Sequence, residues 1–341
     1  MMLKSKKSNH PPLPRKTLET GSPRLGRPVE TSWGKVAGWY HDAVEEKGSY
    51  QKDLILPNLL RLMDIQKGER VFDLACGEGF FSRRFNRLGA SVIGVDIAKE
   101  LIAIAKSNRE QRELTQNIAN KKVEKSPGVI LSDSEESKKD RSFGKPQDDN
   151  AKIEFHVAPA DHIPFIKNNS VDKAVIVLAL QNIESAAGVV QEVSRVLKPR
   201  GKLFIVLNHP AFRIPKASSW GFDPLADSTG SRQASFPRLS LGQAGQVVGT
   251  GVQYRRIDRY LSELREKIQM HPGGKSDETT TSFHRPLQFY VKALRKAGFA
   301  VSNMEEWSSP KKSEPGPRAE AENRARAEFP LFLFLEAIKS Q

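Results

Sequence analysis

The chain has 341 residues, 38% of them hydrophobic and 28% charged, with a formal net charge of +14. This length suits one large domain or two small ones. No apolar run approaches the ~20 residues that a membrane-spanning helix needs, so we expect no membrane span. The one cysteine, Cys76, excludes an internal disulfide and fits a reducing compartment, so we expect a cytoplasmic protein without a bound metal.

Residues 1–30 carry seven basic and two acidic side chains, so they supply +5 of the +14. The segment is rich in Pro, Ser and Lys and has no aromatic residue, which predicts a disordered basic arm. Basic charge makes a nucleic-acid partner possible. Such a partner is not favoured, because basic and aromatic residues are not interleaved here as they are in surfaces that bind single-stranded nucleic acids.

Two amphipathic helices are predicted after the arm, within residues 32–65. Trp33, Val36, Trp39 and Tyr40 recur at helical spacing, so they would share one face. That face is expected to pack against the core that follows.

The run VFDLACGEGFF, residues 71–81, predicts a strand, a turn of small residues and the start of a helix. A second strand, 91–95, leads to Asp96, close to 20 residues after the glycines. This is the layout of a nucleoside-binding strand–helix–strand unit, in which glycines admit close approach of a ligand and the acid binds ribose hydroxyls.

The identity of the nucleoside follows from two further residues. A dinucleotide fingerprint requires glycine where Ser82 stands, and no Gly-Lys-Ser/Thr completes a phosphate-binding loop. Asp73 would repel a diphosphate but attract a ligand that carries an amine and a sulfonium. These residues favour S-adenosylmethionine (SAM) over NAD.

Strands and helices alternate through the rest of the core, which predicts a mostly parallel, doubly wound sheet with ligands at the carboxyl ends of its strands. The expected strands are 70–74, 91–95, 152–156, 171–178 and 201–207, and the expected helices are 80–88, 99–109 and 186–197. Residues 111–150, charged and without periodicity, predict a disordered insertion.

A second insertion, residues 211–285, is rich in aromatic residues and histidines. A long loop of this kind above the carboxyl edge of the sheet predicts a substrate cap. A helix is expected over 286–299 and two last strands over 299–307 and 331–338, joined by a charged link that is long for a hairpin.

Five motifs in order, namely DLACGEG, GVDIA, APADHIPF, SVDKAVIVLALQNIE and EVSRVLKPRGKLFIVLNHP, resemble the class I SAM-dependent methyltransferases. The resemblance is to the type 11 subgroup, which includes the ubiquinone/menaquinone-biosynthesis methylases, and it covers roughly residues 71–210. It implies a seven-stranded sheet closed by a C-terminal antiparallel hairpin, within one methyltransferase domain over residues 31–341. Ala75 occupies the first glycine position of the family motif.

The resemblance also implies roles for single residues around the cofactor. Asp73 would orient the amino group of SAM, the turn backbone would contact its methionine end, and Asp96 would bind both ribose hydroxyls. The adenine would meet Ile97, Ala160 and Asp161, the Leu178 carbonyl would face the methyl or amine, and Tyr40 would close over the methionine end. The turn residues in question are Ala75, Gly77 and Gly79.

Two histidines are candidate general bases if the acceptor must lose a proton. His209 follows the fifth strand, and His284 lies in the cap, where each could face an acceptor. A capping or packing role is the alternative for both.

We therefore expect methyl transfer by in-line displacement to a small molecule, at oxygen or carbon. The alternatives are an RNA- or protein-directed methyltransferase that uses the basic arm, and a non-catalytic SAM-binding protein. The sequence leaves the acceptor and the oligomeric state open.

Overall fold

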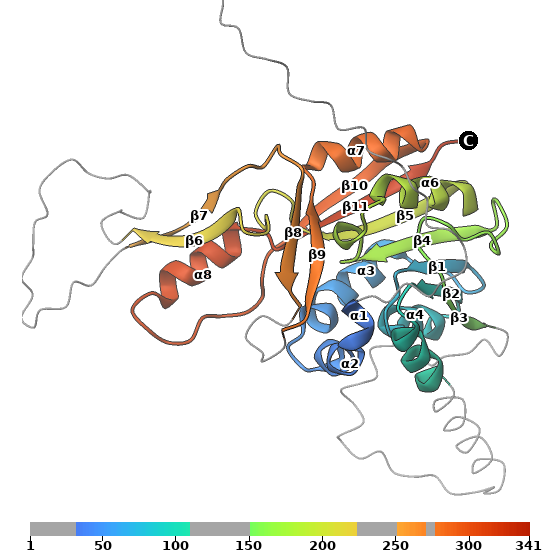
Figure 1. Ribbon diagram of the computed structural model, residues 1–341, viewed down its shortest axis with the longest axis horizontal. Coiled ribbons are helices and arrows are strands. Elements are labelled where there is room, and N and C mark those ends of the chain that lie inside the picture. Colours follow the sequence, from blue (N-terminus) through green and yellow to red (C-terminus); the bar gives the residue numbers. More distant parts are fainter. Residues whose placement is uncertain (1–31, 110–150, 224–250, 271–276) are drawn as a thin grey trace, which may run out of the picture.

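The structure is a computed structural model that describes residues 32–109, 151–223, 251–270 and 277–341 (Figure 1). The expected basic arm, residues 1–30, and the expected insertion, residues 111–150, lie outside the described residues.

A seven-stranded sheet forms the centre of the molecule, in the order β10-β11-β5-β4-β1-β2-β3. Five of its strands pair in parallel, and β11 runs antiparallel to both β5 and β10, as expected for a sheet closed by a C-terminal hairpin. The strands are β1 (Arg70–Leu74), β2 (Ser91–Asp96), β3 (Ile153–Val157), β4 (Val171–Val177), β5 (Leu197–Asn208), β10 (Phe299–Trp307) and β11 (Phe332–Lys339).

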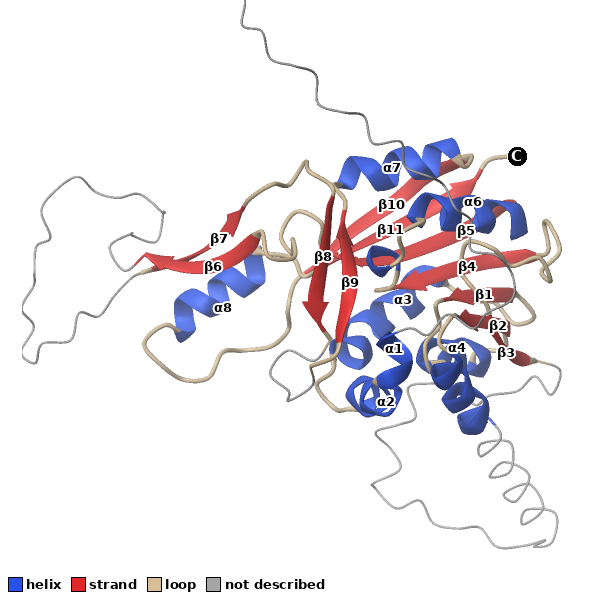
Figure 2. Ribbon diagram, in the orientation of Figure 1, coloured by secondary structure: helices blue, strands red, loops and turns tan. Residues whose placement is uncertain are grey.

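The central strands are apolar on both faces because helices cover both sides of the sheet (Figure 2). On one face, α6 (Ala186–Val196) and α7 (Leu287–Lys296) pack on a core that includes Ile176 and Leu335. On the other face, α3 (Leu56–Met63) and α4 (Phe80–Arg87) enclose Phe85, Phe204 and Phe334. The predicted doubly wound fold is confirmed.

The amino-terminal helices are more broken than the periodicity predicts. The segment expected as two helices forms α1 (Ser32–Lys35), α2 (Ala37–Glu45), the π-helical turn η1 (Gln51–Ile55) and α3. Residues 99–109, helical as expected, follow β2, and η3 (Leu180–Asn182) follows β4. In the described part of the chain, no helix has the length and apolar character that crossing a membrane requires.

The expected cap loop is the first correction, because it contains two β-hairpins. β6 (Ser218–Asp223) pairs with β7 (Val252–Ile257), and β8 (Leu264–Gln269) pairs with β9 (Thr279–His284), both antiparallel. Figure 1 shows the β8–β9 hairpin across the end of the sheet where β4 and β5 finish, and the β6–β7 hairpin projecting away from it.

The long link before the last strand is the second correction, since it forms α8 (Ala319–Glu328) rather than loop alone. This helix packs against β7, and Phe329 beyond it meets Trp220 edge-on with ring centroids 5.3 Å apart. The link is long because it supports the projecting hairpin as well as joining β10 to β11.

Candidate functional site

The turn between β1 and α4 requires left-handed backbone at three positions. Ala75, Gly77 and Gly79 have φ values of +52°, +57° and +79°. A Cβ on Gly79 would lie 2.7 Å from the Phe155 ring, and one on Gly77 would lie 3.2 Å from Tyr40. The two glycines are therefore required both for the backbone conformation and for space, and the turn leaves an open cradle of peptide groups.

Asp96 ends β2 directly beside this turn. One carboxylate oxygen accepts the Gly77 N–H at 2.9 Å, and the other accepts the Ala98 N–H at 2.8 Å. Burial raises the pKa of the Asp96 carboxyl, and the backbone donors oppose that shift. Because each carboxylate oxygen has two lone pairs, Asp96 can hold the turn and still accept two hydroxyl hydrogen bonds.

Asp73 lies beneath the turn, with 1% of its surface exposed. The Ser82 hydroxyl donates to it at 2.5 Å. Burial raises the Asp73 pKa to about 7, against the hydrogen bonds from Ser82, and the nearby Asp96 charge adds to the rise. Among the described residues no basic side chain pairs with Asp73, and a buried carboxylate of this kind favours a cationic ligand, which fits the amine and sulfonium of SAM.

Tyr40 on α2 covers the turn from above. Its ring is the nearest group to a Cβ built on Gly77, and it meets Trp33 edge-on at 5.6 Å. Burial is the main cause that raises the Tyr40 pKa, and the negative charges of Glu78 and Asp96 raise it further. Tyr40 thus lies close to these acids and to Asp73, and its role as a lid over the methionine end stays a prediction.

A buried ion-pair network, which the sequence analysis missed, fastens α2 to the turn. Glu78 is fully buried and pairs with Arg83 at 2.7 Å, and Arg83 also reaches Glu45 of α2 at 3.1 Å. His41 Nδ1 lies 3.4 Å from Glu78. Burial raises the pKa of Glu78, against the Arg83 charge. The signal was present in the motif, where Glu78 stands between the two glycines, but its partners Arg83 and His41 lie 5 and 37 residues away along the chain.

The predicted adenine contacts lie at the neighbouring strand ends. Ile97 and Asp161 are half-buried, and Ala160 packs against the core. A Cβ on Gly188 would lie 3.5 Å from that of Asp161, so the acid faces the start of α6. No contact described here tests these roles, which stay predictions.

Leu178 connects the cofactor side of the site with the cap side. Its φ is +53°, unusual for a branched side chain, and its carbonyl accepts the Gln181 amide at 2.7 Å. That hydrogen bond identifies which end of the Gln181 amide is nitrogen. The Gln181 Oε1 atom is buried without a hydrogen-bond partner in the described part of the chain.

His209 has both ring nitrogens engaged. Nδ1 accepts the Ala211 N–H at 3.2 Å, which makes Nε2 the donor to Glu306 at 2.6 Å. Burial lowers the His209 pKa, while Glu306 opposes the shift. These are the contacts of a capping histidine, the alternative role considered from the sequence, and its catalytic role stays a prediction.

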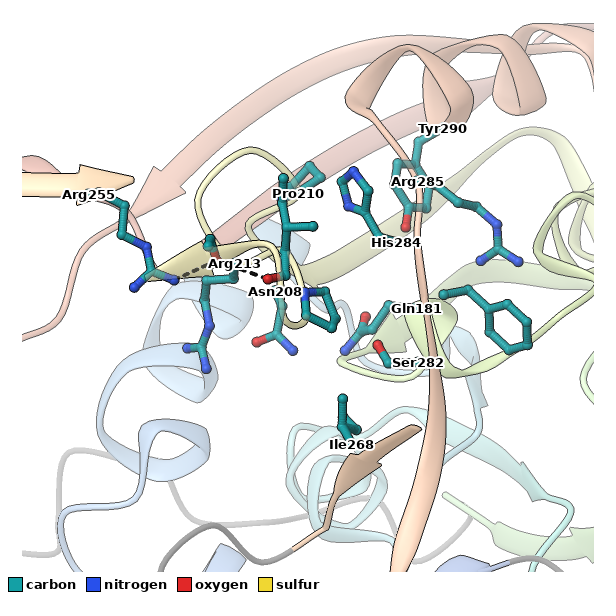
Figure 3. Close-up of a pocket in the computed structure, with 14 residues that line it drawn as sticks. Gln181, Asn208, Pro210, Arg213, Arg255, Ile268, Ser282, His284, Arg285 and Tyr290 are labelled. Carbon is teal, nitrogen blue, oxygen red and sulfur yellow. Dashed lines mark hydrogen bonds between the residues drawn. The ribbon is translucent and has the colours of Figure 1, made fainter. Parts of the chain in front are cut away.

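A cavity of about 250 Å³ opens between the ends of β4 and β5 and the two cap hairpins (Figure 3). Gln181, Asn208, Ser282 and His284 are among the residues that border it, so η3, β5 and β9 all contribute. The sequence analysis predicted a substrate cap here, and of this lining it singled out His284.

His284 is poised differently from His209. Its Nε2 donates to the Tyr260 carbonyl oxygen at 2.8 Å, because a carbonyl can only accept a hydrogen bond, so Nδ1 carries the lone pair in the neutral ring. Burial lowers its pKa from 6.5, and the Tyr260 carbonyl and Glu263 oppose this shift. The ring is therefore neutral at pH 7 and can accept a proton at Nδ1.

The sheet order, the glycine turn and the acids at the ends of β1 and β2 are those of a doubly wound, nucleoside-binding type of fold. Residues 72–205 match the family described as a methyltransferase domain. The fold is similar to that of a SAM-dependent methyltransferase from Mesorhizobium loti, with 23% identity, a TM-score of 0.51, and coverage of 83% of this chain and 96% of that one.

Two curated relatives are similar in sequence. The chain is 27% identical over 220 residues to the ubiquinone/menaquinone biosynthesis C-methyltransferase of Haemophilus ducreyi, covering 64% of this chain and 63% of that protein. It is 37% identical over 82 residues to the ubiquinone biosynthesis O-methyltransferase of Coxiella burnetii, covering 23% of this chain and 34% of that protein. The chain thus spans less than two thirds of the length of either relative. The match to the methyltransferase-domain family covers residues 72–205 of the 341, and the fold is similar to that of a SAM-dependent methyltransferase.

Proposed function

We propose that this protein transfers a methyl group from SAM to a small-molecule acceptor, at oxygen or carbon, held in the cavity beneath the cap hairpins. The observation that carries the proposal is the Gln181 side chain, which donates to the Leu178 carbonyl at the cofactor side and borders the cavity on the other. If the Leu178 carbonyl faces the cofactor as proposed, the cavity begins where the cofactor site ends.

The cofactor residues act by holding and orienting. Asp96 accepts the ribose hydroxyls, Asp73 the amino group, and the peptide groups of residues 75–79 face the methionine end. Ile97, Ala160 and Asp161 would enclose the adenine, and Tyr40 would exclude water from the methionine end. When bound, SAM supplies a methyl group already activated by its sulfonium.

The acceptor residues position a nucleophile in line with that methyl group. The unpartnered Gln181 Oε1 is available to accept a hydrogen bond from an acceptor hydroxyl, and His284 Nδ1 is available to take its proton. Alignment of the two reactants is the main contribution, which reaches ~7–11 kcal/mol in well-oriented reactions.

The proposal is tested by filling the cavity. In Ile268→Trp the indole would occupy the acceptor space, whereas Lys267→Trp places the same side chain on the exposed, opposite face of β8. Transfer of labelled methyl from SAM to the small-molecule fraction of a host lysate should fall in the first variant only, with SAM affinity unchanged in both. Equal transfer by both variants would contradict the proposal.

The same assay separates the alternatives. Label in RNA or protein would favour a macromolecular acceptor and a docking role for residues 1–30, which lie outside the described residues. SAM binding without label in any fraction would favour a non-catalytic protein. The division into a basic arm and one domain over residues 31–341, and the cytoplasmic location, stay predictions.

A further inference from the structure

Every charged side chain among the described residues that line the acceptor cavity is positive. Three arginines border it, and none of the described residues that line it is Asp or Glu. Figure 3 shows Arg213 and Arg255 together on one side of the cavity and Arg285 on the opposite side. Cations gathered around a cavity without acids attract an anionic ligand.

Arg213 is the least committed of the three. Its guanidinium lies 5.9 Å from the Phe332 ring centroid, and among the described residues no carboxylate pairs with it. Its side chain keeps access to solvent, so a ligand can reach it. Nothing described in the fold requires its charge.

Arg255 is held in place beside it. It donates from Nε to the Phe212 carbonyl at 2.9 Å and from Nη2 to the Ser218 hydroxyl at 2.7 Å, and its guanidinium stacks over Trp220. Partial burial, then the neighbouring Arg213 charge, lowers the Arg255 pKa. The two guanidinium groups therefore repel each other, and an anion between them would relieve that repulsion.

Arg285 borders the opposite side of the cavity. Arg285 is 4% exposed, lies between the Phe283 and Phe289 rings, and donates from Nη2 to the Ile183 and Glu184 carbonyls. Its Nη1 is buried without a hydrogen-bond partner in the described part of the chain. Arg285 therefore adds to the positive charge around the cavity but lies apart from the Arg213–Arg255 pair.

We infer that the methyl acceptor carries an oxyanion group, a carboxylate or a phosphate, that binds between Arg213 and Arg255. This inference rests on the proposed function, because it names the class of acceptor for the same cavity. The anionic group would fix the orientation of the acceptor, leaving its hydroxyl to face Gln181 and His284. Arg213 and Arg255 are thus specificity-determining residues.

The test uses the full chain saturated with S-adenosylhomocysteine, and titrates three ring-bearing probes in low-salt buffer without phosphate. Benzoate represents a carboxylate, phenyl phosphate represents a phosphate, and benzamide is the neutral control of similar shape. At least one anionic probe should bind about ten-fold or more tightly than benzamide, as charge-assisted hydrogen bonds predict. Which anion binds more tightly distinguishes the two kinds of acceptor.

The matched variants are Arg213→Gln and Arg256→Gln. Arg256 neighbours Arg255 on β7 but is exposed and pairs with Asp258 at 2.8 Å, away from the cavity lining. The first variant should lose the preference for the anion, Arg213→Lys should recover part of it, and the second variant should keep it. Thermal unfolding of each variant identifies any that fails to fold.

Equal binding of benzamide and the anions, no binding of any probe, or identical behaviour of the two glutamine variants would overturn the inference. Binding of S-adenosylhomocysteine and labelled-methyl transfer are measured on the same preparations. Their persistence in such a case would leave the proposed function standing, whereas their absence would reject the proposed function itself.

Discussion

The cofactor turn and the acceptor cavity are built in opposite ways. The turn and its two acids lie within residues 73–98, joined by short hydrogen bonds such as Gly77 N–H to Asp96. The cavity takes its lining from residues spread over 181–290, on η3, β5 and the cap hairpins. A site made by one continuous segment leaves a motif in the sequence, whereas a site assembled from several elements leaves only scattered residues.

The largest expected effect concerns Asp96. Asp96→Ala should lower SAM affinity by about 10²-fold or more, because two charge-assisted hydrogen bonds to ribose would each contribute roughly 1.5–3 kcal/mol. Calorimetric titration measures this. Asp172→Ala is the matched control, since Asp172 also accepts a backbone N–H, that of Arg70, but at the opposite end of the strands. If the two regions are independent, probe binding in the cavity will not change in either variant.

Asp73 tests the electrostatic cost of the cofactor site. Its folded pKa of about 7 lies above the ordinary 3.8, so its contribution to stability is complete below pH 3.8 and is lost as pH rises toward 7. Asp73→Asn replaces the carboxyl with a group that does not ionise, so the protein no longer loses stability as pH rises. It should raise the free energy of unfolding at pH 8 by on the order of 4 kcal/mol while weakening SAM binding. Urea unfolding at pH 4 and pH 8 measures the difference.

Asp172 serves as the control for this prediction, because its pKa is shifted in the opposite direction to that of Asp73. Hydrogen bonds from Lys198 and Arg70 outweigh partial burial and lower the Asp172 pKa, so its contribution is present above pH 3.8 and is lost as pH falls through the folded pKa. Asp172→Asn should therefore destabilise the protein at pH 8. Parallel behaviour of the two variants would show that Asp73 is not an uncompensated acid.

His284, which borders the cavity, and His209, which contacts Glu306 at the end of β5, should respond differently to substitution. His284→Ala should lower the rate of methyl transfer by roughly 10²-fold without changing SAM affinity, if the ring acts as a base. In the wild type the rate should rise with pH through a value below 6.5 and then level off, because burial lowers the His284 pKa.

His209→Ala should chiefly lower stability, by about 1–3 kcal/mol, since it leaves Glu306 and the Ala211 N–H without their partner. Single-turnover rates and thermal unfolding separate the outcomes, and a reversed pattern would return the catalytic role to His209.

The smallest effect concerns backbone strain in the turn. Ala75→Gly should raise the free energy of unfolding by up to about 1 kcal/mol, because φ of +52° favours glycine. Arg200→Gly, at φ +63° in β5, should give a similar gain. Only the first substitution lies in the cofactor site, so a change in SAM affinity confined to Ala75→Gly would show that the strain there serves binding.

Much of the fold could be predicted because its periodicity is local. The strands expected at 70–74 and 299–307 coincide with β1 and β10, and the other core strands agree to within a few residues at their ends. The cap was expected as a loop because its strands, such as β8 (LREKIQ), are too polar for an apolar alternation. Their hairpins are held by partners far away in the chain, including η3 and α8, which no local pattern records.

For this protein, the sequence alone predicted the class of cofactor, and it determined the glycine turn with its acids and the doubly wound sheet. Each of these depends on residues close together in the chain, for which the spacing along the sequence fixes the relative positions in space. Only the tertiary structure decided that Glu78 and Arg83 fasten α2 to the turn, that both ring nitrogens of His209 are engaged, and that three arginines border one cavity. Those relations depend on contacts between distant segments, which packing alone brings together.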